Sequence, residues 1–120
     1  MTTLRLALPT MGSRGMRDVV SDVFSRAATF TIIDVEDGEV KHIMVEVNTA
    51  SDLKQGAGPI VAKNLKEKGV DVIVASEVGP GAQTLLEMSG IRMIQVASGV
   101  KVKKATTEAL KQLVQSTQQP

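Results

Sequence analysis

Two short glycine-containing segments have the residue types that could bind an anion. Gly79-Pro80-Gly81 follows an apolar run, and Gly56-Ala57-Gly58 precedes an amphipathic one. A helix that starts at either segment leaves its first N–H groups without helical partners, and glycine has no Cβ to keep an anion at a distance. Pro80 suits the first helical position, where its missing N–H costs nothing. The segments predict an anion-binding site, with ordinary turn geometry and close helix packing as the competing interpretation.

Charged side chains near these segments are of both signs. The neighbouring loops carry four cations, Arg14, Arg17, Arg26 and Lys54, and four carboxylates, Asp18, Asp22, Asp52 and Glu77. Arg26 could add a two-pronged donor to a bound anion, because a guanidinium presents parallel N–H groups. The competing interpretation is that these are solvated loop charges that largely cancel.

Metal binding by side chains and hydrolytic catalysis are less well supported by the sequence. His42, the one histidine, falls in the middle of a predicted edge strand, where exposure is the simpler interpretation. Met11 and Met16 could offer thioether sulfur to a soft metal, but filling gaps between loops is the commoner role of methionine. Asp18, Asp22, Asp34 and Glu36 invite comparison with two-metal nucleases. That comparison fails because the first strand has no carboxylate. A Ser–His or Cys–His catalytic site is not predicted either, because no nucleophile is expected beside His42.

Length and composition limit the number of domains and the kinds of partner that can be expected. The chain of 120 residues suits one domain, and its net charge is +1, from 14 basic and 13 acidic residues. Neither a nucleic-acid partner nor a membrane partner is therefore expected. Cysteine is absent, which excludes thiolate-based metal sites. The start of the chain has no apolar signal region, and no apolar run is long enough to cross a bilayer, so we expect a cytoplasmic protein.

Periodicity predicts five strands and three helices. Strands are expected over residues 4–8, 28–35, 39–47, 71–75 and 91–96, and helices over 59–68, 80–89 and 102–115. Pro9 is expected to stop the first strand, and Asp37-Gly38 predicts a tight hairpin. In the third strand Ile43, Val45 and Val47 share one face, and the opposite face is polar, which indicates a sheet edge. Residues 10–20 form a flexible loop, and residues 115–120 a frayed tail.

This order of elements defines a fold. A three-strand meander followed by right-handed crossovers gives an α/β, three-layer fold with helices on both faces of a mixed five-stranded sheet. The strand order is 3-2-1-4-5, with the second strand antiparallel, which is a ribonuclease H-like topology. Four loops, over residues 11–26, 48–58, 76–81 and 97–100, would then surround one cleft at the carboxyl ends of the parallel strands, where such sheets bind ligands.

The residues also resemble a known family. The ordered set is Phe24-Ser25-Arg26-Ala27, Asp37-Gly38, Gly56-Ala57-Gly58, Gly69-Val70-Asp71 and Gly79-Pro80-Gly81-Ala82. Together these segments resemble the dinitrogenase iron-molybdenum cofactor biosynthesis family over about residues 4–113. The resemblance implies a ribonuclease H-like fold and a role in binding or carrying metal–sulfur clusters. Members often have histidine where this chain has Val23 and Gln55, and the change weighs against tight binding of nitrogenase cofactor.

Three functions follow as expectations. The first is a non-enzymatic carrier of an anionic cluster containing molybdenum or iron, which it passes to an acceptor protein. The second is binding of a phosphorylated metabolite or another small anion at the same glycine segments. The third is an interaction domain whose third strand pairs with a partner or with itself, so that the chain is a monomer or a weak homodimer. The site residues expected for the first are Arg26, Gly56, Ala57, Gly58, Gly79, Pro80 and Gly81.

Overall fold

A mixed sheet of five strands forms the centre of the molecule. The computed structural model describes residues 3–53 and 55–118. The sheet order is β3-β2-β1-β4-β5, with β1 (Thr3–Thr10), β2 (Thr29–Glu36), β3 (Glu39–Val47), β4 (Val72–Ala75) and β5 (Arg92–Gln95). β2 runs antiparallel to both of its neighbours, whereas β4 is parallel to β1 and to β5. The predicted α/β topology is confirmed.

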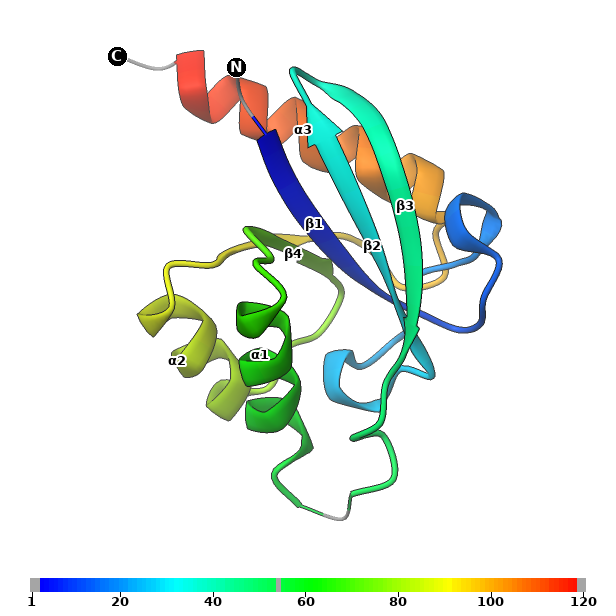
Figure 1. Cartoon of the computed structure of the whole chain (residues 1–120), viewed down its shortest axis with the longest axis vertical. Coiled ribbons are helices and arrows are strands. Elements are labelled where there is room, and N and C mark those ends of the chain that lie inside the picture. Colours follow the sequence, from blue (N-terminus) through cyan, green and yellow to red (C-terminus); the bar gives the residue numbers. More distant parts are fainter. Residues whose placement is uncertain (1–2, 54, 119–120) are drawn as a thin grey trace.

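Helices cover both faces of the sheet. Figure 1 shows α1 (Ala57–Glu67) and α2 (Pro80–Met88) on one face and α3 (Val102–Gln118) on the other. Two short 3-10 turns, η1 (Gly15–Arg17) and η2 (Phe24–Arg26), interrupt the segment between β1 and β2. No helix in the described part of the chain is both long and apolar enough to span a membrane.

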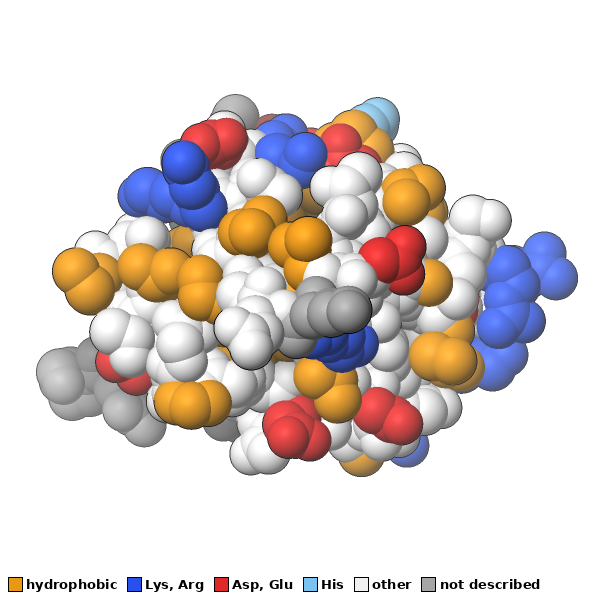
Figure 2. Space-filling view, turned by 90° about the horizontal axis from the view of Figure 1, so that it is seen from below, with side chains coloured by type: hydrophobic (Ala, Val, Ile, Leu, Met, Phe, Trp, Pro, Cys, Tyr) orange, Lys and Arg blue, Asp and Glu red, His pale blue; other side chains and the backbone are white. Residues whose placement is uncertain are grey.

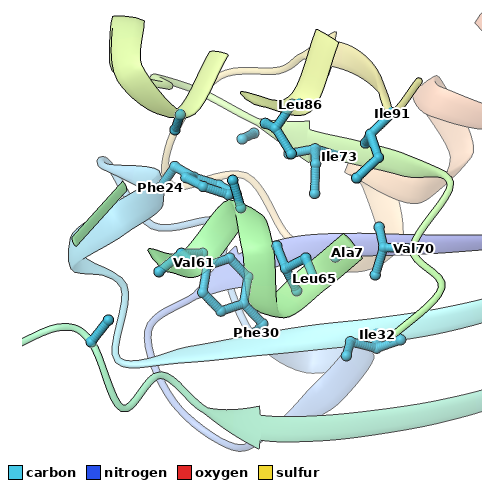
Figure 3. Close-up of a cluster of buried hydrophobic side chains, with 14 of the residues drawn as sticks. Ala7, Phe24, Phe30, Ile32, Val61, Leu65, Val70, Ile73, Leu86 and Ile91 are labelled. Carbon is cyan, nitrogen blue, oxygen red and sulfur yellow. The ribbon is translucent and has the colours of Figure 1, made fainter. Parts of the chain in front are cut away.

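Two hydrophobic cores fill the spaces between the layers. The core under α1 and α2 includes Phe24 and Phe30, whose rings meet edge to face with centroids 5.4 Å apart. Figure 3 shows these rings beside Val61 and Leu65 of α1. Phe24 belongs to η2, so its burial fixes that turn against the helices. The second core lies under α3 and is built from aliphatic side chains of β1, β2 and β4 together with the buried face of α3.

The turns confirm most predicted boundaries, and Pro9 is an exception. Asp37 and Gly38 have φ values of 51° and 84°, as a tight hairpin turn requires. β1 continues through Pro9 instead of stopping there. The Pro9 carbonyl accepts a hydrogen bond from the Ser21 N–H at 2.8 Å, on the side away from β2. Because N and C=O of one strand residue point to the same side, the missing N–H of Pro9 removes no bond between β1 and β2.

β3 is an edge strand, as predicted, but its polar face is the one that packs under a helix. Met44 contacts the core beneath α1, and the Glu46 carboxylate lies 3.1 Å from the Lys68 Nζ at the end of α1. The apolar face is only partly covered: Ile43 lies beside Gly15 of η1 and is 40% exposed, and Val47 is 75% exposed. The sequence pattern alone does not reveal which face of this edge strand a helix covers.

Several helix predictions need correction. α1 begins at Ala57, before the predicted start at residue 59, and α3 continues to Gln118 instead of fraying from Ser116. The end of the predicted tail, 119–120, lies outside the described residues. Ile60 is 43% exposed, because α1 turns Val61 and Leu65 toward the core. The side chains that α3 buries most fully are Val102, Ala105 and Ala109.

Candidate anion-binding site

The two glycine segments lie directly beside each other. A Cβ built on Gly58 would lie 3.2 Å from the Ala82 Cβ, and one built on Gly81 would lie 3.5 Å from the Pro59 Cγ. The starts of α1 and α2 are therefore in contact. Figure 1 shows both helices beginning at the same, lower end of the molecule. The sequence prediction that these segments share one place is confirmed by this geometry.

Neither helix start is capped by a side chain. The N-cap residues are Gly56 for α1 and Gly79 for α2, and among the described residues no side chain caps either helix with a hydrogen bond. The first turn of each helix also has no acidic residue. The partial positive charge at a helix N-terminus is normally offset by such groups. Here two adjacent termini leave their first-turn N–H groups for water or for an anion.

The glycines of the site have different physical reasons for being glycine. Gly56 has φ of 76°, a left-handed conformation that other residues rarely adopt. Gly58 allows α1 to approach Ala82 of α2 closely. Gly79 differs, because its φ of −65° suits any residue and a Cβ there would meet no atom within 4 Å. Turn geometry and packing thus account for Gly56 and Gly58, but they do not account for Gly79.

Arg26 stabilises the loop before α1 through hydrogen bonds. Its Nη1 donates to the carbonyl of Ser51 at 2.9 Å and also to the carbonyl of Leu53. The exposed guanidinium thereby brings positive charge to this end of the molecule while it holds the segment that leads into Gly56. The sequence pointed to Arg26 as a donor to ligand; in the structure these bonds make it a support of the loop.

Asn48 supports the same loop and was missed by the sequence analysis. Its buried side-chain amide donates to the carbonyls of Ser25 at 3.0 Å and Ala27 at 2.9 Å. Its side-chain oxygen accepts the Ala50 N–H at 3.1 Å. An asparagine directly after a strand often bonds to the backbone two residues on, and this is the signal that could have found it. Asn48 and Arg26 together tie η2 to the 48–53 segment.

The predicted cleft is partly filled by the chain itself. Residues 18–24 cross the carboxyl ends of the strands, with bridges between Thr10 and Val20 and between Val23 and Glu77. The Phe24 N–H donates to the Glu77 carbonyl at 3.0 Å. The loop over residues 11–26 was expected to border the cleft; part of it instead covers the strand ends. A ligand must therefore bind outside this cover, at the helix starts.

Asp18 holds this cover in place and is not a solvated charge. Its side chain is fully buried and accepts N–H bonds from Val19 at 2.8 Å and Arg14 at 3.1 Å. The Arg14 guanidinium lies 3.6 Å away. Burial is the largest single effect on the carboxyl and opposes its charge, but these N–H groups and the Arg14 charge together hold the pKa of Asp18 below its ordinary value.

A hollow of about 340 Å³ lies next to the start of α2. Its lining includes Ser76, Val78 and Gln83, together with Met93 and Gln95 from β5. This volume is within the usual range for small-ligand sites. The hollow gives a ligand at the start of α2 room beside the strand ends.

Charges at this end of the molecule are mixed. Figure 2, seen from the end where α1 and α2 begin, shows acidic and basic side chains scattered among hydrophobic ones. Lys54, one of the expected cations, lies outside the described residues. Within the described chain no group of three or more His, Asp or Glu side chains is placed to hold a metal ion. The electrostatic attraction here therefore comes from the two helix termini and Arg26.

The remaining candidates are dispersed. His42 lies on β3, with its Nδ1 3.9 Å from the Asp34 carboxylate and its side chain 64% exposed. Asp34 itself is bound by Arg5 at 2.7 Å. Met16 packs against the core under α3, and Met11 is 59% exposed. These positions give His42 and Asp34 no place at the helix starts.

The two positions at which the resemblance led us to expect histidine flank the helix starts. Val23 pairs with Glu77, just before Gly79, and Gln55 comes directly before Gly56. Both positions thus adjoin the paired helix starts. The departures from the family pattern are at the candidate site itself.

Comparison with known proteins gives consistent matches. The family model described as dinitrogenase iron-molybdenum cofactor matches residues 5–112. An uncharacterised protein of Methanocaldococcus jannaschii is 31% identical over 88 residues, which are 73% of this chain and 70% of that protein.

Solved structures agree. The apo form of the orange protein from Desulfovibrio gigas is 29% identical, with a TM-score of 0.82 over 90% of this chain and 88% of that one. A Thermotoga protein provisionally described as a NifB protein is 35% identical, with a TM-score of 0.72 over 91% and 88% of the two chains.

Proposed function

Because this chain belongs to the dinitrogenase iron-molybdenum cofactor family, we propose that it binds an anionic metal–sulfur cluster containing molybdenum or iron. The site is the pair of helix starts at Gly56-Ala57-Gly58 and Gly79-Pro80-Gly81. The observation that carries the proposal is that two adjacent helix N-termini lack both side-chain caps and first-turn acids. Helix termini of this kind favour anions.

We propose carriage of the cluster, and not catalysis. The donors at the site are backbone N–H groups, with Arg26 holding the adjoining loop. Such donors can hold the oxo or sulfido edge of a cluster without reacting with it, and the cluster can then pass to an acceptor protein. One structural relative, the orange protein, is described in an apo form, which denotes a protein without its bound group. This description supports binding of a group by a protein of this fold.

Gly79 allows a sharp test. Gly79→Asp places a carboxylate at the N-cap of α2, where the backbone angles and the open space accept it. The new cap should stabilise the helix by about 0.5 kcal/mol, while it neutralises the terminus and competes with the ligand. Gly79→Ala is the matched control, because it adds a Cβ without a capping oxygen. The two variants separate anion binding from helix stability.

The measurement is a titration of wild type and both variants with tetrathiomolybdate, with inorganic phosphate as the comparison anion. We expect Gly79→Asp to weaken thiomolybdate binding at least tenfold, about 1.4 kcal/mol, and Gly79→Ala to leave it nearly unchanged. His42→Ala should change affinity less than twofold, because His42 lies on β3. Equal affinity of wild type and Gly79→Asp would remove the helix starts as the site. Tighter binding of phosphate than of thiomolybdate would favour a phosphorylated ligand.

A further inference from the structure

The outer edge of β3 presents unpaired backbone groups over its second half. The Asn48 N–H donates to the Ala28 carbonyl at 3.0 Å, so Asn48 faces β2. In an antiparallel pair, successive residues direct their N–H and C=O groups alternately toward the partner strand and away from it. Val47, Val45 and Ile43 therefore direct theirs away from β2. Because β3 is last in the sheet order, these groups face the open edge.

The same three residues present an apolar surface. Ile43 is 40% and Val47 75% exposed, and Val45 is half-buried between them. Edge strands are usually protected by charges, bulges or a cover. The first half of β3 has such protection: a bulge interrupts its pairing with β2 near Val40, and Lys41 pairs with Glu39 at 3.1 Å. In the second half η1 lies beside Ile43, but all the residues that direct their backbone groups outward have apolar β-branched side chains, and Val47 is the most exposed of them.

We propose that this half of β3 pairs with the same strand of a second copy of this chain, antiparallel and around a two-fold axis at Met44. In that register Ile43 of each copy exchanges backbone hydrogen bonds with Val45 of the other. Their apolar side chains then meet on the open face. The two sheets join into one, and the edge that each copy leaves open is removed.

The polar side chains of β3 favour this register. On the face toward α1, His42 of one copy stands opposite Glu46 of the other, and the symmetry repeats the pair. The Glu46 carboxylate lies 3.1 Å from the Lys68 Nζ, also interacts with the Arg5 charge, and keeps further acceptor capacity. The His42 side chain is 64% exposed and can donate to it. One two-fold axis thus pairs Ile43 with Val45 on one face and His42 with Glu46 on the other. This self-complementarity is the reason to propose a second copy of this chain as the partner.

Cysteine cross-linking tests this arrangement, since the natural chain has no cysteine. At the two-fold axis the Met44 residues form a non-hydrogen-bonded pair with Cα atoms about 4.5 Å apart, within the range that a disulfide spans. Met44→Cys should therefore form a disulfide-linked dimer rapidly under mild oxidation. Thr107→Cys, at an exposed position of α3, is the control and should cross-link only slowly. Equal rates for the two variants would overturn the proposal, and faster cross-linking of Val45→Cys than of Met44→Cys would overturn the register.

Sedimentation equilibrium provides an independent measurement. Wild type should show a concentration-dependent dimer. Val45→Pro should weaken the dimer at least tenfold, because it removes an outward N–H that the fold of one copy does not use. Ile43→Lys should weaken it as well, without any change to the backbone. A wild type that stays monomeric at all concentrations, or dimers of both variants as strong as those of wild type, would overturn the proposal. Cluster binding does not enter this test, so its outcome is independent of the proposed function.

Discussion

A single buried carboxylate fixes the segment that covers the ends of the strands. Asp18 receives N–H bonds from Val19 and Arg14, and its own carbonyl accepts the Val102 N–H at 2.9 Å. One residue thereby ties η1 to the start of α3. Because η1 and η2 belong to the same crossing segment, the position of Phe24 beside the helix starts depends in part on this carboxylate.

Replacing Asp18 should destabilise the fold in a pH-dependent way. The fold lowers the pKa of Asp18, so its contribution is complete above the ordinary value of 3.8 and is lost as the pH falls through the folded-state pKa. We expect Asp18→Asn to cost about 1–3 kcal/mol at pH 7, because buried N–H groups lose a charged acceptor. Urea denaturation at pH 7 and pH 3 should show the difference from wild type shrinking in acid. Asp22→Asn, at an exposed position, is the control, and a difference that stays constant with pH would contradict this assignment.

At the scale of elements, the pairing of α1 with α2 creates the site. Gly58 lies close to Ala82, and Gly81 lies at ordinary contact distance from Pro59. Close approach places the two helix termini together, so their partial charges act on the same ligand. The packing of α1 against α2 therefore depends on Gly58, and the proposed anion binding depends on the two helix starts that this packing brings together.

Substitutions at these glycines should affect stability in different directions. Gly58→Val should destabilise by about 1–3 kcal/mol, because its side chain must displace Ala82 in a tightly packed contact. Gly81→Ala should be neutral or stabilising by up to about 1 kcal/mol, since alanine favours the helix and the Pro59 contact accepts a Cβ. Urea denaturation of both variants measures this. Similar unfolding midpoints for the two would show that the helices do not pack through Gly58.

The sequence predicts the strands and helices well, but it does not predict that residues 18–24 cover the ends of the strands. Asp37-Gly38 is a local signal for the hairpin, and the glycines that follow α1 and α2, Gly69 and Gly90, have left-handed φ values of 76° and 75°. The order of elements then restricts the sheet to the observed topology. The cover over residues 18–24 depends on contacts between distant segments, such as Ser21 with Pro9, which have no local pattern. Asp18 was misjudged for the same reason, because a lone loop carboxylate looks solvated until the backbone folds around it.

At the scale of the whole molecule, the candidate site and the proposed dimer edge lie on different elements. The site is built from the starts of α1 and α2, whereas the open edge is the second half of β3. The 48–53 segment connects them, because it leaves β3 at Asn48 and is held by Arg26 before α1 begins. The sheet therefore positions two surfaces with separate chemistry, and each can be altered without the other.

Ligand binding at the helix starts should stabilise the whole fold. A ligand that binds only the folded state at 100 times its Kd adds about 2.7 kcal/mol. For a chain of this size that corresponds to a rise in Tm of about 10 °C. Wild type should show this rise with tetrathiomolybdate in a thermal melt, and so should Gly79→Ala. Gly79→Asp should melt slightly higher without ligand but gain only about half as much at the same concentration, because a tenfold weaker Kd leaves about 1.4 kcal/mol. If thiomolybdate raises the Tm of Gly79→Asp as much as that of wild type, the anion binds elsewhere on the molecule.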